Sequence, residues 1–120
     1  MIKAGKYKIP LIILKPRNHF NLCLIYSHGN SSDVGLSLTE AYNLAIHTYT
    51  CVVCYEYPGY SLAKETPITE KNIYKHIRLT YNYVRHTLKF NERQIMLYGF
   101  SIGTGIAFDL ACRKDYPISG

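Results

Sequence analysis

The sequence contains no apolar run that approaches the roughly 18 residues a membrane-spanning helix requires. Lysines occur among residues 1–8, but no apolar stretch follows them as it would in a secretory signal peptide. Low-complexity runs, internal repeats and linker-like stretches are also missing, while 48% of the residues are hydrophobic. The composition is typical of a globular protein. We expect it in the cytoplasm, with peripheral contact at a membrane left open.

Acidic residues are few, with 8 aspartates and glutamates against 14 lysines and arginines, and the net charge is +6. The basic residues are spread along the chain, with a mild cluster at Lys3, Lys6, Lys8, Lys15 and Arg17. No nucleic-acid-binding motif accompanies this cluster, so a solvated surface explains it better than a nucleic-acid partner. At 120 residues the chain is at most one small domain.

Cysteine is sparse as well, and of the 4 cysteines only Cys51 and Cys54 have the spacing of a metal or redox motif. Both fall within an expected strand, in which residues three apart point to opposite faces. Thiols on opposite faces cannot readily share a metal ion or form a disulfide. We therefore expect reduced, buried cysteines, and the sequence predicts neither a metal site nor an organic cofactor.

Short apolar segments at residues 9–14, 22–27, 51–56 and 95–98 have the pattern of β-strands. Pro10 places the first near an edge of a sheet, because proline cannot donate a hydrogen bond to a neighbouring strand. Segment 22–27 is continuously apolar, as in a strand that is covered on both faces. Helical segments separate these strands. The alternation predicts an α/β fold with a mostly parallel sheet and flanking helices.

Capping residues predict where the helices begin. Ser32 or Asp33 suits the cap of the first helix, and Thr69 suits the cap of the second. Apolar residues of the second helix keep a 3.6-residue spacing at positions 73, 77, 81, 84 and 88. The third helix is expected to begin at Ser101 and to end near Arg113.

The most informative motif is Gly99-Phe100-Ser101-Ile102-Gly103, between the last expected strand and the third helix. This is the G-x-S-x-G pattern of a nucleophile elbow, in which a strained serine projects its hydroxyl clear of the sheet. The two glycines remove Cβ atoms that would collide across so sharp a turn. N–H groups and the positive dipole end of the following helix face a developing oxyanion. We predict that Ser101 is a catalytic nucleophile, with an ordinary glycine-rich turn as the alternative.

Two further polar segments follow the other expected parallel strands, namely His28-Gly29-Asn30 and Glu56-Tyr57-Pro58-Gly59-Tyr60. Taken in order with the elbow, they resemble the α/β-hydrolase superfamily. Residues 24–30 and 97–104 are most similar to the branch of α/β-hydrolase domain-containing proteins that includes membrane-associated palmitoyl-protein thioesterases. The resemblance runs from about Ile9 to the last residue, and it is more specific for fold than for substrate.

The resemblance implies a serine hydrolase that forms an acyl-enzyme on Ser101. Its expected substrates are acyl thioesters or esters on an acylated protein or a lipid-like molecule, with S-palmitoyl cysteine as one candidate. The backbone N–H groups of Asn30 and Ile102 would form the oxyanion hole, while Glu56 and residues 57–60 would shape the rim. Four residues would shape the elbow and the neighbouring loop: His28, Gly29, Gly99 and Gly103.

The same resemblance places a catalytic acid and then a histidine after the serine. Residues 102–120 hold Asp109 and Asp115 but no histidine, and Asp109 is expected on the surface of the third helix. We therefore expect residues 1–120 to be the N-terminal portion of one α/β-hydrolase domain, without its C-terminal strands. Strand 95–98 would then be an exposed edge that favours self-association.

The histidines elsewhere are poorly placed to act as the general base. His47 and His86 are expected at the far ends of their helices, His19 in the opposite turn and His76 within the second helix. Only His28 shares the edge of the sheet with Ser101. A Ser101–His28 dyad is the less favoured alternative to a histidine that organises its loop.

A second functional hypothesis is a truncated remnant or a binding module that has the same fold but no turnover. A reading frame that continues past Gly120 through an acid and a histidine would favour the enzyme. An authentic stop codon there would favour the remnant.

Overall fold

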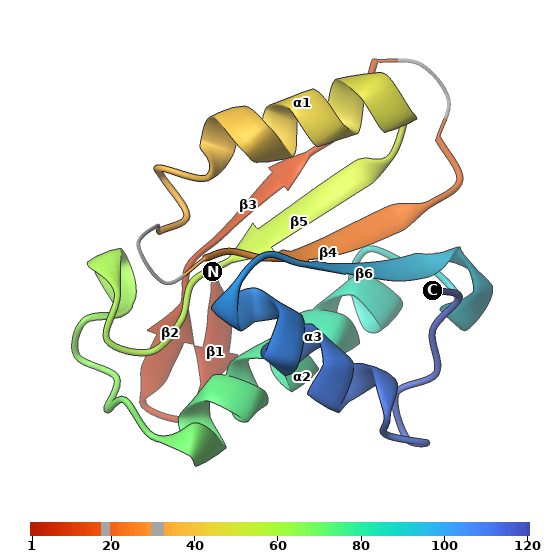
Figure 1. Ribbon diagram of the computed structural model, residues 1–120. Coiled ribbons are helices and arrows are strands. Elements are labelled where there is room, and N and C mark those ends of the chain that lie inside the picture. Colours follow the sequence, from red (N-terminus) through yellow and green to blue (C-terminus); the bar gives the residue numbers. More distant parts are fainter. Residues whose placement is uncertain (18–19, 30–32) are drawn as a thin grey trace.

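The computed structural model describes residues 1–17, 20–29 and 33–120, and it contains a four-stranded sheet with helices on both faces (Figure 1). The sheet has the order β3-β5-β4-β6. Strand β4 pairs in parallel with β5 and with β6, and β3 pairs antiparallel with β5. The predicted α/β class with a mostly parallel sheet is confirmed. The strands are β3 (Leu11–Leu14), β4 (Cys23–Ser27), β5 (Cys51–Tyr55) and β6 (Ile95–Gly99).

Helix α1 (Leu38–Thr48) covers one face of the sheet, while α2 (Glu70–His86) and α3 (Ile102–Ala111) cover the other (Figure 1). Short 3₁₀ helices lie at Ser61–Ala63 and Glu92–Gln94. Because side chains alternate along a strand, the buried residues of β4 and β5 divide into two clusters, one on each face. Cys51 belongs to the cluster under α2 and α3, and Cys54 to the cluster under α1. The prediction that these thiols point to opposite faces is confirmed.

The N-terminal segment folds differently from the prediction of one strand over residues 9–14. Pro10 divides it, because its missing N–H interrupts strand pairing. The residues before it form an antiparallel hairpin of β1 (Ile2–Ala4) and β2 (Tyr7–Ile9). The residues after it form β3, which lies at an edge of the main sheet as Pro10 predicted.

The predicted start of the first helix is wrong. Helix α1 begins at Leu38, with Ser37 at the N-cap position, and Ser32 lies outside the described residues. Asp33 instead closes a turn ahead of the helix: its side-chain Oδ1 accepts the N–H of Leu36 at 2.8 Å, and its carbonyl accepts the N–H of Ser37 at 2.9 Å. An aspartate that can cap a helix can equally close such a turn, so the local signal was ambiguous.

Helix α2 agrees with its predicted cap and apolar face. The side-chain oxygen of Thr69 accepts the N–H of Asn72 at 3.1 Å, and Ile77, Tyr81 and Val84 are buried. The polar residues His76 and Thr80 are also buried on this helix. No helix in the part of the chain that the structure describes is long and apolar enough to cross a membrane.

We expect His76 to make the stability of the fold depend on pH. Its Nδ1–H donates to the carbonyl oxygen of Glu56 at 2.8 Å, and burial lowers its pKa. The unfolded chain then binds a proton that the folded chain does not. The free energy of unfolding should therefore fall as the pH drops below about 6.5, with a slope from His76 of at most about 1.4 kcal/mol per pH unit. Urea unfolding at several pH values should show a smaller slope for His76→Gln, and equal slopes would contradict this.

The edge of β6 is not open where an exposed edge was predicted. The N–H of Ser119 donates to the carbonyl oxygen of Ile95 at 2.7 Å, and the N–H of Leu97 donates to that of Gly120 at 2.8 Å. The prediction is therefore wrong for residues 95–97, because the final residues of the chain turn back and occupy part of this edge.

Candidate active site

Ser101 lies between β6 and α3 in a backbone conformation that side-chain-bearing residues rarely adopt, with a φ of 56° and a ψ of −119°. Its side chain is exposed, and Ile102 is the first residue of α3. The N–H of Ile102 is in the first turn, where N–H groups have no partner within the helix. The backbone is the strand-to-helix elbow that the motif predicts, and the catalytic role of Ser101 stays a prediction.

The glycines of the elbow let it pack directly on the end of β4. A Cβ on Gly103 would lie only 2.1 Å from the carbonyl oxygen of Ser27, and one on Gly99 would lie 2.5 Å from the carbonyl oxygen of Gly103. The N–H of Phe100 also donates to the Ser27 carbonyl at 3.1 Å. No side chain fits at either glycine while these contacts are kept.

The loop that follows β4 reaches the elbow at Gly29. A Cβ on Gly29 would lie 3.1 Å from Cδ1 of Phe100 and 3.8 Å from Cβ of Ser101. The structure thus brings Gly29 and Ser101 together, because the carboxyl ends of neighbouring parallel strands meet at one edge. Asn30, the predicted second oxyanion donor, lies outside the described residues, as does His19.

His28 is fully buried, and both of its ring nitrogens are engaged. Nδ1 lies 3.0 Å from the carbonyl oxygen of Gly29, and Nε2 lies 2.8 Å from Oε1 of Glu56. In this arrangement neither nitrogen is available to the hydroxyl of Ser101. The geometry contradicts the Ser101–His28 dyad and favours a histidine that organises its loop.

Glu56 follows β5 and is also fully buried. Besides His28, it binds two backbone groups: Oε1 accepts the N–H of Tyr57 at 3.1 Å, and Oε2 accepts the N–H of Val34 at 3.0 Å. The ring of Tyr57 lies 3.9 Å from the His28 ring, and its hydroxyl donates to the His28 carbonyl at 2.5 Å. Burial raises the pKa of the Tyr57 hydroxyl well above its usual range. Sequence reasoning assigned Glu56 to the rim and missed its bond to His28.

Several charged residues lie away from Ser101. Asp109 of α3 forms two hydrogen bonds with Arg113, just beyond the end of the helix, at 2.9 and 3.3 Å, in agreement with the expected helix-surface position. His47 and His86 are near the C-terminal ends of α1 and α2, which lead to the opposite edge of the sheet. Within residues 1–17, 20–29 and 33–120, no group of three histidine, cysteine, aspartate or glutamate residues could hold a metal ion.

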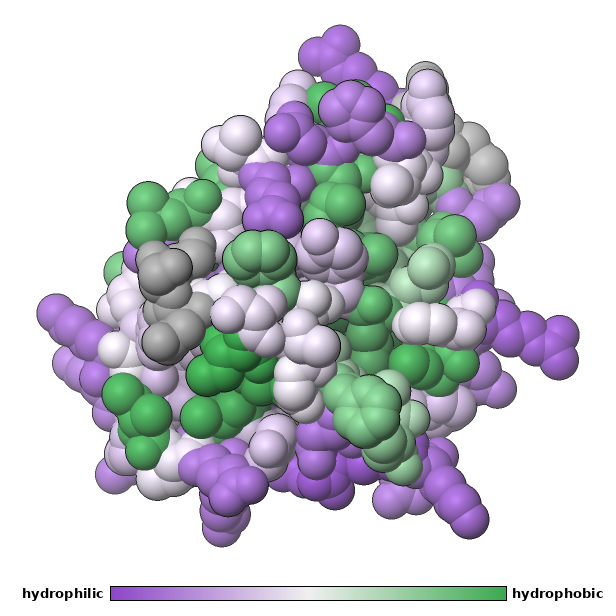
Figure 2. Space-filling model, in the orientation of Figure 1, coloured by the Kyte–Doolittle hydropathy of each residue, from purple (hydrophilic) through white to green (hydrophobic). Residues whose placement is uncertain are grey.

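An apolar groove of about 360 Å³ runs beside the elbow, between the start of α2 and the start of α3. Four isoleucines line it, and two of these are well exposed, Ile68 at 67% and Ile102 at 46%. Figure 2 shows hydrophobic side chains on this face of the molecule, with hydrophilic side chains around its margin. The lining isoleucines are Ile68, Ile73, Ile102 and Ile106. Sequence reasoning did not predict this groove, since its walls come from separate elements.

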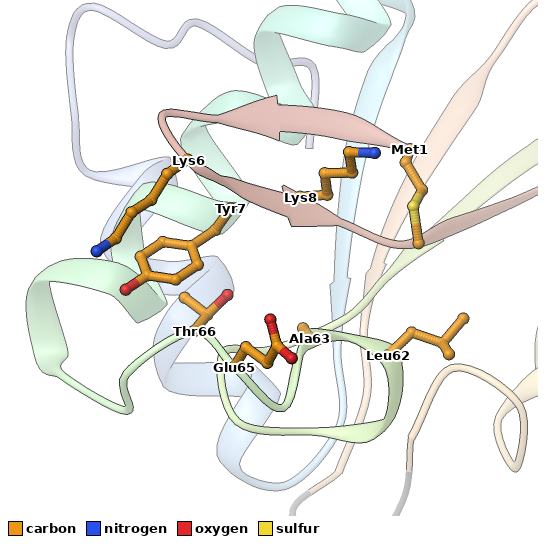
Figure 3. A pocket seen from close by; sticks show the side chains of 8 residues that line it. All are labelled: Met1, Lys6, Tyr7, Lys8, Leu62, Ala63, Glu65 and Thr66. Atoms are coloured by element: carbon orange, nitrogen blue, oxygen red, sulfur yellow. The ribbon is translucent and has the colours of Figure 1, made fainter.

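A second cavity, of about 250 Å³, lies between the β1–β2 hairpin and the segment around residues 62–66 (Figure 3). Lys6, Tyr7 and Lys8 line it from the hairpin, and Glu65 and Thr66 line it from the opposite segment. None of its lining residues belongs to the predicted site. It is therefore distinct from the groove beside Ser101.

Curated proteins similar to this chain are α/β hydrolases, although no protein-family model matches it. It is 37% identical over 100 residues to the α/β hydrolase domain-containing protein aho-3 of Caenorhabditis elegans. The matched region covers 83% of this chain and 29% of that protein. It is 34% identical over 92 residues to human α/β hydrolase domain-containing protein 17C, covering 77% of this chain and 28% of that protein. It is 28% identical over 110 residues to a putative α/β hydrolase, L404 of Acanthamoeba polyphaga mimivirus, and the matched region covers 42% of that protein. The chain thus spans less than half the length of these relatives.

A solved structure supports the same assignment at the level of fold. The ester hydrolase EH1AB1 from the metagenome of Lake Arreo, complexed with a derivative of bipyridine phosphonate, matches with a TM-score of 0.74 at 20% identity. The match covers 98% of this chain and 39% of that one. The fold, the elbow at Ser101 and the sequence relatives agree. Together they support the assignment of this chain, which covers part of the length of its relatives, to the α/β-hydrolases.

Proposed function

We propose that Ser101 is the nucleophile of a serine hydrolase that cleaves acyl esters or thioesters. The observation that carries this proposal is the strained backbone of Ser101 at the start of α3, with a φ of 56°. Such strain persists only where the surrounding structure imposes it, and it concentrates at functional sites. The exposed hydroxyl and the first N–H groups of α3 would then face the same reacting carbonyl.

In the proposed reaction, Oγ of Ser101 attacks the acyl carbon and gives its proton to a general base. The N–H of Ile102 stabilises the resulting oxyanion, an interaction typically worth about 3 kcal/mol per donor. The intermediate expels the alkoxide or thiolate, which takes up the proton, and an acyl-enzyme remains. Water then attacks the acyl-enzyme and releases the carboxylic acid and the free serine.

The general base must come from a histidine other than His28, whose nitrogens bind Gly29 and Glu56. Residues 102–120 contain no histidine. The proposal therefore takes the triad acid and histidine from the part of the domain that the longer relatives have beyond the matched residues. The alternative is a module of the same fold without turnover. Turnover that depends on Ser101, measured on the gene product that contains this chain, decides between the two.

The groove lined by isoleucines supports an acyl group as the part of the substrate that binds beside Ser101. Ile102 follows the proposed nucleophile directly and lines the groove, so a chain attached at Ser101 could lie along it. S-palmitoyl cysteine on a protein is our candidate substrate, in keeping with the resemblance in sequence. A substrate of this kind would bring the protein to a membrane surface as a peripheral component.

We expect Ile68→Asp to lower kcat/KM for a long-chain acyl ester by about tenfold and to leave that for a short-chain ester nearly unchanged, because the charge opposes burial of apolar chain. Hydrolysis of p-nitrophenyl esters of increasing chain length checks this. Phe108→Asp is the matched control, since Phe108 is exposed to 69% but does not line the groove. An equal loss for short and long esters would contradict the placement of the acyl chain.

A further inference from the structure

The loops around Ser101 are joined by one buried carboxylate, that of Glu56. We propose that Glu56 is a positioning residue: through a proton shared with His28, it holds Gly29 against Ser101 and so sets the reactivity of the nucleophile. This inference rests on the proposed function of Ser101, but it concerns a different residue and a different step, the placement of the loop.

The carboxylate binds the loop after β4 on both sides. Oε1 lies 2.8 Å from Nε2 of His28, near the start of the loop, and Oε2 accepts the N–H of Val34 at 3.0 Å, near its end. The N–H of Tyr57 gives Oε1 a second bond at 3.1 Å. A single side chain that directly follows β5 therefore binds both ends of the loop that follows β4.

The geometry requires a proton between Glu56 and His28. Nδ1 of His28 faces the carbonyl oxygen of Gly29, which can only accept, so Nδ1 must carry hydrogen. If Nε2 and Glu56 were both without a proton, two lone pairs would face each other at 2.8 Å. One proton must lie between them, on either the nitrogen or the oxygen. The pair is then neutral overall, as two fully buried ionisable groups require.

Further contacts fix the pair in place. The hydroxyl of Tyr57 donates to the carbonyl of His28, and its ring packs on the imidazole at a centroid distance of 3.9 Å. At the other end, Nδ1–H of His76 donates to the backbone carbonyl of Glu56 at 2.8 Å. The His28–Glu56 pair is thus held from the segment after β5, through Tyr57, and from α2, through His76.

Displacement of this loop should act on Ser101 directly. Gly29 is close enough that a Cβ on it would lie 3.8 Å from the Cβ of Ser101. A shift of about 1 Å near reacting atoms can cost on the order of a hundredfold in rate. We call the bonds of Glu56 to His28 and Val34 the clamp. Losing this clamp should therefore slow attack by Ser101 even when the fold persists.

Glu56→Gln tests the proposal, because a glutamine cannot satisfy all three partners at once. If its NH₂ group turns toward His28 it faces the N–H of Tyr57, and if it turns the other way it faces the N–H of Val34. We expect labelling of Ser101 by a fluorophosphonate to slow by at least about tenfold in the gene product that contains this chain, at a temperature where the variant is still folded. Glu40→Gln is the control, since Glu40 accepts a hydrogen bond from the hydroxyl of Tyr26 and makes none of the contacts of Glu56.

An unchanged labelling rate in folded Glu56→Gln would overturn the proposal, as would equal slowing in Glu40→Gln. If Glu56→Gln does not fold, ¹⁵N spectroscopy of the wild-type His28 ring decides: a proton on Nδ1 together with a hydrogen bond between Nε2 and Glu56, whichever of the two atoms carries the shared proton, supports the clamp, and a Nε2 without any hydrogen bond overturns it. If wild-type Ser101 is not labelled, the proposed function fails. The clamp then stands or falls with slow exchange of the Val34 amide, which Glu56→Gln should accelerate.

Discussion

Gly103→Ala is expected to prevent folding, or to lower the free energy of unfolding by about 3 kcal/mol or more. The added methyl group would lie 2.1 Å from the carbonyl oxygen of Ser27 and 3.0 Å from that of His28. Both atoms belong to the backbone at the end of β4, where parallel pairing with β5 and β6 resists movement. Urea unfolding followed by circular dichroism measures the loss.

Gly105→Ala, two residues further along α3, is the matched control. A Cβ at Gly105 meets nothing within 4 Å, so the same substitution in the same helix adds no clash. Alanine is the better helix former, and stability should rise by roughly 0.5–1 kcal/mol. If both variants lost stability equally, close packing of the elbow on β4 would not explain the requirement for glycine at position 103.

Replacing Ser101 should separate the loss of stability caused by the strained elbow from the role of the serine in hydrolysis. Ser101→Gly relieves the positive φ, which costs a residue with a side chain about 1–3 kcal/mol, although the unfolded chain gains freedom with glycine. We expect a net gain in stability of roughly 1 kcal/mol together with loss of hydrolysis. Ser101→Ala should lose hydrolysis equally while its stability stays near that of the wild type, because alanine keeps the strain.

The measurements are thermal unfolding of the three proteins and initial rates of ester hydrolysis by the gene product that contains this chain. Hydrolysis should fall by a factor of about 10³ or more in both variants. Hydrolysis that persists in Ser101→Ala would remove the serine from the mechanism. If Ser101→Gly were less stable than Ser101→Ala, the positive φ at position 101 would not be a source of strain.

Local sequence signals predicted the elements that carry the elbow. Continuous apolar runs bounded by polar loops identified β4, β5 and β6, and the cap at Thr69 identified the start of α2. These signals act within a few residues, so the sequence contains them directly. Local signals were ambiguous elsewhere: Asp33 closes a turn instead of capping α1, and Pro10 separates two strands.

The arrangement around Ser101 depends on residues far apart in the chain. His28 and Glu56 each follow a strand, and the parallel pairing of β4 with β5 places the two strand ends side by side. That pairing was predictable, but it does not by itself say that the two side chains turn inward and bond to each other. The isoleucine groove also needs α2 and α3 in their packed positions, and periodicity within one helix says nothing about a neighbouring helix.

The proposed activity depends on one exposed serine, in a strained turn ahead of α3, that attacks acyl carbonyls. Peptide mapping by mass spectrometry after treatment with a fluorophosphonate tests this most directly, on the gene product that contains this chain. We expect a single phosphonate adduct, on the peptide that carries Ser101, and none in Ser101→Ala. An adduct on another serine, or equal modification of both proteins, would contradict the role of Ser101.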